Sequence, residues 1–235
     1  MRILSVIHGT DARTELFAPA ITEAGHELDE WSFGWGSPPP KPLESYDAVF
    51  VFGGAMHADE DEHHPWLVDE VAWLRDILDR GTPVPGVCLG AQLIARARGA
   101  RVWRMPDGPE VGWCHVELTE AGGVDPGLSS LPRMFEALQW HHYTYAMPTG
   151  AVELARSPAC TQAYRLGETC WAVQFHPEVT ASQLEGWIDD PEDPPPSPER
   201  LRAETPVKMQ RWNELGRGLC AAFLAAAERV LARAA

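Results

Sequence analysis

The chain has 235 residues, of which 45% are hydrophobic and 23% are charged, a composition typical of a folded protein with one sizeable core. Its formal net charge is −15 at pH 7 and no run of Lys and Arg stands out, which argues against nucleic acid as a partner. No apolar run reaches membrane-spanning length, and the N-terminal segment turns polar too early for a signal peptide.

The N-terminal part of the chain contains two apolar runs with the pattern of buried parallel strands. They are RILSVI at 2–7 and DAVFVFGG at 47–54, and the second run ends in two glycines. An amphipathic stretch at 15–26 and a loop rich in Pro, Gly and Trp lie between them.

The following segments continue this alternation of strands and helices. Residues 65–81 predict a helix, because a proline opens the segment, apolar side chains recur along one face and a glycine closes it. The sequence VPGVC at 84–88 predicts another strand, and a helix-like pattern follows at 90–100. We therefore expect an α/β fold with a doubly wound, mostly parallel sheet flanked by helices.

From residue 100 onward, short strand-like runs separated by turn residues indicate a small additional antiparallel sheet. The runs are ARVWRM, GWCHVELT, RMFEAL, AVELARS, TQAYRL and TCWAVQF. Residues 189–199 are acidic and Pro-rich and predict an exposed loop, and residues 207–235 predict a closing helix. Because the chain has no internal repeat and no clear linker, we expect a single domain over residues 1–235.

A cysteine stands between two glycines where a predicted strand turns into a helix. Gly86 and Gly90 lack the Cβ atoms that would clash in a sharp turn, so Cys88 can lie exposed at the carboxyl end of the strand. The N-terminal end of the following helix favours the thiolate over the thiol. The N–H of Leu89 and the pair Gly53–Gly54 are candidate donors for an oxyanion. Taken alone, this motif fits a buried core cysteine equally well.

A second motif favours catalysis. The strand-like run WAVQFHPEV at 171–179 ends in His-Pro-Glu. A cysteine nucleophile needs a base, and the base needs an acceptor that orients it. His176 can take the proton of the Cys88 thiol, and Glu178 can hold the imidazole in the required tautomer.

Four segments, in order, resemble the class I glutamine amidotransferase family, and most closely the glutaminase part of GMP synthetase and its stand-alone relatives. They are FGGAMHADEDEHHPWLVDE, GVCLGAQLIARARGARV, EVGWCHVEL and QAYRLGETCWAVQFHPEV. With LQWHHYTYAMPTGAVELARSP, the resemblance covers roughly residues 45–180. It implies a flavodoxin-like fold.

The resemblance also implies a chemistry. It assigns a catalytic triad to Cys88, His176 and Glu178 and an oxyanion site to the amides of Gly54 and Leu89. The implied substrate is a small γ-glutamyl amide, which the thiol attacks to give a γ-glutamyl thioester that water then hydrolyses. The triad and the oxyanion donors supply this chemistry, so we expect no metal and no organic cofactor.

The expected substrate-binding residues include positions where the chain departs from the family. They are Gly53, Gln92, His141, His142 and Tyr143. Gln92 matches a substrate-contacting position, and His141 matches the first residue of a His-Gly-Asp segment that binds the amino-acid end of the substrate. His142 and Tyr143 replace the glycine and the acid. Either another acid takes this role, or the substrate is not free glutamine, or these residues only pack in a loop.

Two further features bear on metals and on the cell compartment. Residues 57–64 carry four acids and three histidines, for which we expect a solvated charged loop rather than a metal site. The five cysteines are odd in number and lack metal-type spacing, which favours a reduced, cytoplasmic setting.

The sequence leaves several functions open. The segments outside the resemblance are too short for a synthase domain, so the chain either supplies ammonia to a separate synthase subunit or acts alone as a γ-glutamyl hydrolase or peptidase. A non-catalytic regulatory or partner-binding module on the same frame is the alternative of another class, and the peptidase and chaperone branches of the same superfold are a further one. The oligomeric state has no signature in the sequence.

Overall fold

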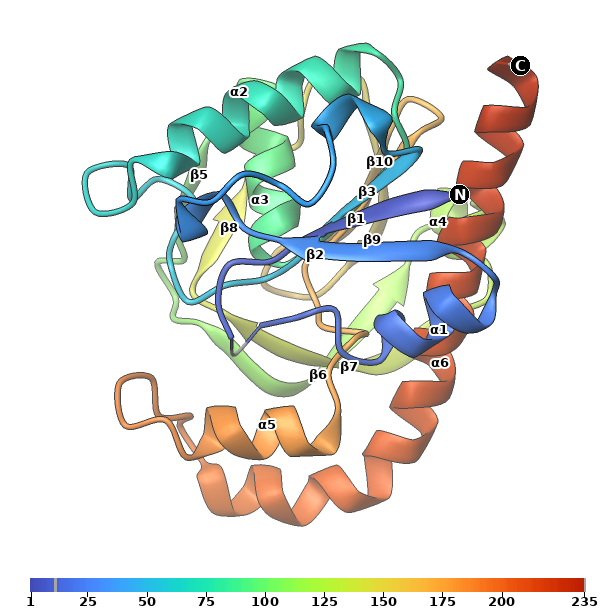
Figure 1. Ribbon diagram of the computed structural model, residues 1–235. Coiled ribbons are helices and arrows are strands. Elements are labelled where there is room, and N and C mark those ends of the chain that lie inside the picture. Colours follow the sequence, from blue (N-terminus) through green and yellow to red (C-terminus); the bar gives the residue numbers. More distant parts are fainter. Residues whose placement is uncertain (11, 235) are drawn as a thin grey trace.

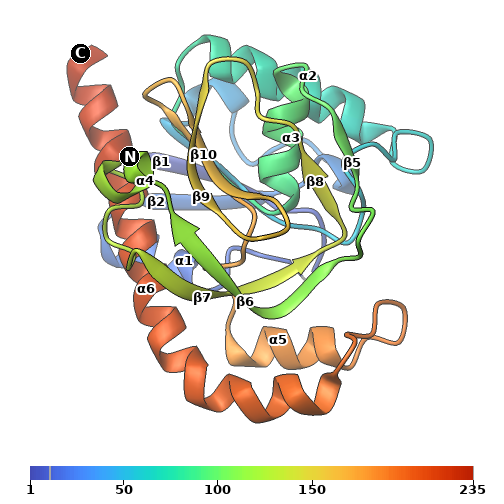
Figure 2. The same ribbon diagram turned by 180° about the vertical axis from the view of Figure 1, so that it is seen from behind.

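A nine-stranded sheet forms the centre of the computed structural model, which describes residues 1–10 and 12–234. Its strand order is β2-β1-β3-β4-β11-β10-β9-β6-β7, and a separate two-stranded sheet pairs β5 with β8 (Figures 1 and 2). The strands are β1 Arg2–Val6, β2 Glu27–Trp31, β3 Ala48–Val51, β4 Val84–Val87, β5 Val102–Arg104, β6 Glu110–Leu118, β7 Met134–His141, β8 Tyr143–Tyr145, β9 Ala151–Arg156, β10 Thr161–Leu166 and β11 Cys170–Val173.

Helices cover both faces of the large sheet. They are α1 Phe17–Glu23, α2 Trp66–Asp79, α3 Leu89–Ala97, α4 Glu120–Val124, α5 Ala181–Ile188 and α6 Pro198–Ala234, with short 3-10 turns at Phe33–Trp35 and Leu43–Ser45. Helices α2 and α3 pack on one face, and α1 and α6 pack on the other (Figure 1). Two clusters of buried apolar side chains, one on each side of the sheet, form the core. No helix among the described residues is both long and apolar enough to cross a membrane.

The sheet changes from parallel to antiparallel along its width. Strands β2, β1, β3, β4 and β11 run parallel, and β10, β9, β6 and β7 continue the sheet with antiparallel pairings. The α/β fold, with its flanked sheet and small antiparallel sheet, is therefore the expected one. Most of the antiparallel strands extend the main sheet, however, and only β5 and β8 form the sheet beside it.

The topology gathers several strand ends at one edge. Because β1, β3, β4 and β11 are parallel neighbours, their carboxyl ends open onto the same side of the sheet. In open α/β sheets, ligands bind in the crevice outside these ends. The motifs with Gly53, Cys88 and His176 all follow such strands directly.

Three predicted segments differ from the structure. Residues 27–31, predicted as part of a loop, form the edge strand β2, whose mixed sequence ELDEW has no continuous apolar run. The closing helix begins at Pro198 instead of 207. Proline usually interrupts a helix, so the sequence predicted a start after Pro206, but the helix continues through this residue. Helix α6 changes direction along its length, and its first turns lie beside α5 (Figures 1 and 2). The loop at 189–199 is accordingly shorter and ends at 197.

Candidate active site

The strand-to-helix turn at Cys88 has the strained backbone that its sequence predicts. Cys88 has φ 52° and ψ −107°, a region that side-chain-bearing residues rarely adopt. Its N–H donates to the carbonyl oxygen of Val173 at 2.8 Å, which fixes the turn against β11. A Cβ atom at Gly90 would lie 2.1 Å from the carbonyl oxygen of Val51, so only glycine allows this close approach of α3 to β3.

His176 and Glu178 lie beside this turn. The Nδ1 atom of His176 lies 2.8 Å from Oε1 of Glu178, and both side chains are buried. The thiol of Cys88 donates to the carbonyl oxygen of Trp140 at 3.8 Å, and Cys88 lies close enough to the ring to raise the pKa of His176. Gly53 lies close to both, because a Cβ atom there would be 2.9 Å from Cε1 of His176 and 3.6 Å from Cβ of Cys88. The structure thus brings together the three residues predicted as a triad.

The charges in this group favour a protonated imidazole. Burial of His176 opposes its positive charge, but the charges of Cys88 and Glu178 and their hydrogen bonds outweigh burial and raise the pKa of His176 to about 10. A protonated imidazole beside a cysteine nucleophile can give a proton to a leaving group without first acquiring one from solvent.

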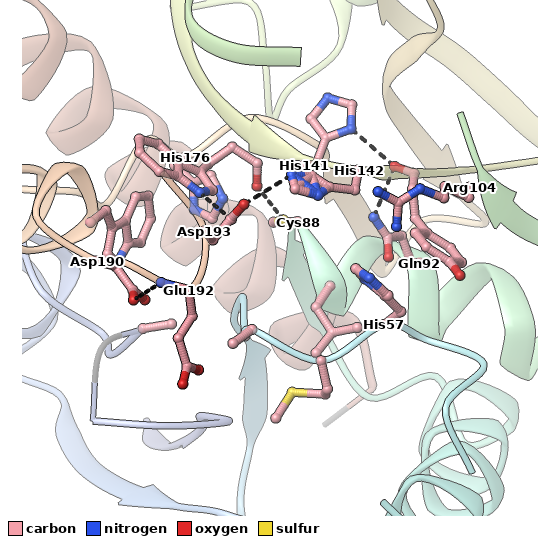
Figure 3. Close-up of a pocket in the computed structure, with 18 residues that line it drawn as sticks. His57, Cys88, Gln92, Arg104, His141, His142, His176, Asp190, Glu192 and Asp193 are labelled. Carbon is pink, nitrogen blue, oxygen red and sulfur yellow. Dashed lines mark hydrogen bonds and ion pairs between the residues drawn. The ribbon is translucent and has the colours of Figure 1, made fainter. Parts of the chain in front are cut away.

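Cys88 and His176 line a cavity of about 460 Å³. Cys88, Leu89 and Gly54 all line it, so the two expected oxyanion donors belong to the pocket that holds the thiol. Figure 3 shows acidic side chains on one side of the pocket and His57, Gln92 and Arg104 on the other. A site of this kind has room for a small amide with charged groups of both signs.

Three of the expected substrate-binding residues are held by one backbone carbonyl. The side-chain amide of Gln92 donates to the carbonyl oxygen of Tyr143 at 3.2 Å, and to Oε1 of Gln174 at 3.3 Å. Nδ1 of His141 donates to the same Tyr143 oxygen at 2.9 Å (Figure 3). Its Nε2 lies 3.3 Å from Glu110. These contacts fix the position of Tyr143 at the pocket wall, where its ring stacks on His57.

The acidic loop after α5 is part of the pocket, which the sequence analysis missed. Asp190, Glu192 and Asp193 line the cavity, although we expected an exposed loop at 189–199. Asp190 and Glu192 are exposed, but Asp193 is half-buried. It accepts the indole N–H of Trp140 at 2.8 Å and lies 3.3 Å from Nε2 of His142. The only signal was composition, since the sequence does not show that α5 and α6 turn this loop back over the strand ends.

Another cluster has the side chains of a metal site but is already hydrogen-bonded. Ligand atoms of Glu110, His141 and Cys160 lie within 4.8 Å of one another. However, Oε2 of Glu110 accepts hydrogen bonds from Gln162 at 2.7 Å and from Ser157 at 3.1 Å. The cluster is therefore a hydrogen-bonded group in which Oε2 of Glu110 lies 3.3 Å from Nε2 of His141.

The charged loop at 57–64 makes local contacts with its own chain. Glu60 accepts the backbone N–H of His57 at 2.8 Å, and Asp61 pairs with the guanidinium of Arg96. Within the described part of the chain, these residues do not form a group with metal-ligand spacing.

Comparison with known proteins gives consistent matches. The family model described as glutamine amidotransferase class-I matches residues 17–188. The glutamine amidotransferase-like protein YfeJ of Salmonella typhimurium is 26% identical over 91% of this chain and 91% of its own length. A γ-glutamyl-L-1-hydroxyisopropylamide hydrolase of a Pseudomonas species is 31% identical over 63% of this chain, which spans about half (52%) of that relative.

Two further matches agree with these. The glutamine-hydrolysing GMP synthase subunit of Thermoplasma volcanium is 34% identical over 61% of this chain and 68% of its own length. Among solved structures, a glutamine amidotransferase from Thermotoga maritima superimposes with a TM-score of 0.84 at 27% identity, covering 97% of this chain and 98% of that one.

Proposed function

The chain belongs to the class I glutamine amidotransferase family, and from this premise we propose that it hydrolyses the γ-amide bond of a small γ-glutamyl compound. In this proposal Cys88 is the nucleophile, His176 is the general base for its thiol and then the general acid for the leaving group, and Glu178 orients His176. The observation that carries it is the position of His176, which lies 2.8 Å from Glu178 and lines one pocket together with Cys88.

The first half-reaction acylates the enzyme. The thiolate of Cys88 attacks the γ-carbonyl carbon, and the oxygen that becomes negative is bound by the N–H groups of Gly54 and Leu89. The C–N bond then breaks as His176 gives its proton to the nitrogen. The products are a free amine, or ammonia when the substrate is glutamine, and a γ-glutamyl thioester on Cys88.

The second half-reaction releases the acyl group. His176, now neutral, takes a proton from a water molecule that attacks the thioester carbon. The same oxyanion donors bind the second tetrahedral intermediate, which expels the thiolate and restores the imidazolium–thiolate pair. The net reaction adds one water to the amide and needs no other reactant.

We further propose that the substrate-binding part of the pocket uses residues from both walls. Gly53 shapes the space between the thiol and the imidazole, while Gln92, His141 and Tyr143 hold one wall through their shared carbonyl. His142 lines the cavity beside them, and its link to Asp193 connects this wall to the acidic loop. A thiol nucleophile must remain reduced, which supports a cytoplasmic setting.

A partner-dependent glutaminase is the second candidate. The similarity to the Thermoplasma GMP synthase protein supports a separate synthase subunit that would receive ammonia. The similarity to the Pseudomonas hydrolase supports an enzyme that acts alone. Tyr143 stands where the resemblance predicts an acid. Because this change alters the expected recognition of free glutamine, it favours the enzyme that acts alone.

One experiment separates these functions. The purified chain is offered glutamine, then γ-glutamyl amines and γ-glutamyl dipeptides, and release of glutamate and amine is measured against a Cys88→Ser blank. Turnover of one compound identifies an autonomous hydrolase. If no substrate is turned over but a glutamine-like electrophile labels Cys88, the chain is a glutaminase that needs its synthase. If there is neither turnover nor labelling, the catalytic proposal is rejected in favour of a non-catalytic module.

A further inference from the structure

A second buried histidine lies behind the glycine pair at the pocket. His8 follows β1, and Gly53 follows the neighbouring parallel strand β3, so both lie at the same edge of the sheet. The Nδ1 atom of His8 lies 3.0 Å from the carbonyl oxygen of Gly53. Its Nε2 atom lies 3.0 and 3.2 Å from the two carboxylate oxygens of Glu70, on α2. The side chains of His8 and Glu70 are fully buried.

The surroundings of this ring favour its protonated form. The two ring nitrogens of His8 face acceptor atoms, the carbonyl oxygen of Gly53 and the carboxyl oxygens of Glu70. An imidazolium, with a hydrogen on each nitrogen, satisfies both partners. Burial alone would lower the pKa of His8, but the charge and hydrogen bond of Glu70 and the backbone carbonyls outweigh it, so its pKa is raised. The imidazolium also stacks on Trp66, with ring centroids 5.8 Å apart.

The hydrogen bond from His8 to the carbonyl oxygen of Gly53 also orients the N–H of Gly54. The carbonyl oxygen of Gly53 and the N–H of Gly54 belong to the same planar peptide, and in a trans peptide they point in opposite directions. By fixing the direction of the Gly53 carbonyl oxygen, His8 therefore also fixes the direction of the Gly54 N–H. The stem of His8 also packs directly on the next residue, since a Cβ atom at Gly54 would lie 2.6 Å from Cβ of His8. Without this hold, two consecutive glycines would leave the peptide free to rotate.

We propose that His8, held by Glu70, is a positioning residue that orients the Gly54 N–H toward the oxyanion formed at Cys88. This inference rests on the proposed function, because it assigns a role in the same reaction. The charged donor also polarises the peptide, and polarised hydrogen bonds in series strengthen one another. Donors aimed in advance at a developing charge lower the barrier without reorganising during the reaction.

The inference predicts a specific kinetic effect. Since the oxyanion exists only in the transition state and intermediates, a misdirected Gly54 N–H should lower kcat and leave KM nearly unchanged. Removal of one oxyanion donor lowers kcat by about 100- to 1,000-fold, so a loss of orientation should lower it by about 10- to 100-fold.

Two matched variants test the donor to Gly53. Both carry Glu70→Gln, so that no unpaired carboxylate remains buried. His8→Asn places an amide N–H near the position of Nδ1, whereas His8→Gln places it near Nε2 and leaves the Gly53 oxygen without its donor. We expect His8→Gln to lose about 10- to 100-fold in kcat and His8→Asn to recover most of that loss. Equal kcat in the two variants, or a change confined to KM, would overturn the inference.

A second measurement separates orientation from general damage. Alkylation of Cys88 by iodoacetamide displaces iodide and forms no oxyanion, so its rate should be the same in the wild type and in both variants. If alkylation slows in parallel with kcat, the histidine only supports the fold, and the inference fails. A wild-type chain that turns over no γ-glutamyl compound rejects the proposed function itself, and the oxyanion role with it. Active wild-type enzyme with an equally active His8→Gln variant rejects only the inference.

Discussion

His176 and Glu178, two residues apart in the sequence, face each other across a single buried contact of 2.8 Å between Nδ1 and Oε1. Pro177 between them restricts the backbone. Distant segments also hold the pair, because the His176 N–H donates to the carbonyl oxygen of Leu138 at 2.9 Å and the Glu178 carbonyl oxygen accepts the Leu16 N–H at 3.0 Å. The contact leaves the other side of the imidazole for Cys88, which lies close enough to raise the pKa of His176. A short motif thereby supplies both an orienting carboxylate and the acid–base group.

Replacement of Glu178 by Gln should slow the reaction and change its pH dependence. The glutamine keeps an acceptor near Nδ1 but removes one of the negative charges that raise the pKa of His176 to about 10. We expect kcat to fall by about 100- to 10,000-fold, which is less than the loss in Cys88→Ser. The alkaline limit of kcat should move to lower pH, because His176 then loses its proton earlier. The test is kcat from pH 6 to pH 11 for wild type and variant, and an unchanged alkaline limit would exclude this carboxylate from the triad.

The His8–Glu70 pair should give stability that depends on pH in a defined direction. The pKa of His8 is raised above its ordinary value of 6.5, so its stabilising effect is fully present below pH 6.5 and is lost as the pH rises through the raised value. In Glu70→Gln the charge that raises the pKa of His8 is gone, so burial lowers this pKa below its ordinary value. Protonation of His8 at low pH then destabilises the folded variant. Urea unfolding at pH 5.5, 6.5, 7.5 and 8.5 measures the effect. The difference in unfolding free energy, wild type minus variant, should decrease as the pH rises, and a constant difference would show that His8 titrates alike in both.

The acidic loop should control substrate binding through Asp193. Asp193→Ala removes the acceptor for Trp140 and the partner of His142, and so detaches the loop from the pocket wall. We expect KM to rise by about 3- to 10-fold with a smaller change in kcat. Asp189→Ala is the matched control, because Asp189 lies at the start of the same loop but pairs with Arg202 on α6. Equal KM values for the two variants would contradict a role of Asp193 at the pocket.

The sequence predicted the parts of the site that depend on local chain geometry. Cys88 could be placed because the flanking glycines mark a sharp turn after an apolar strand, and His176 because it ends another such strand. Parallel pairing of the two strands then brings their ends together.

The remaining parts depend on contacts between distant segments. The edge strand β2 has no continuous apolar run, so its pairing with β1 gives no local signal. Asp193 reaches the pocket because α5 and the first turns of α6 pack side by side, which periodicity within either helix does not reveal. His8 is a single polar residue after a strand, and its role becomes visible only when Glu70 from α2 is found on its ring.

The close packing of α3 on β3 predicts that Gly90 tolerates no side chain. In Gly90→Ala the new Cβ atom would lie 2.1 Å from the carbonyl oxygen of Val51, a backbone atom that cannot move without shifting β3. The shift would also disturb the hydrogen bond from the Gly90 N–H to the carbonyl oxygen of Phe52, now 3.1 Å. We expect the free energy of unfolding to fall by about 3 kcal/mol or more, measured by urea denaturation. Gly186→Ala in α5 is the control, since its Cβ atom would meet open space and should stabilise the helix by about 0.5–1 kcal/mol. If Gly90→Ala were as stable as the wild type, the contact between α3 and β3 would be looser than the structure has it, and the fixed position of Cys88 at the start of α3 would lose its support.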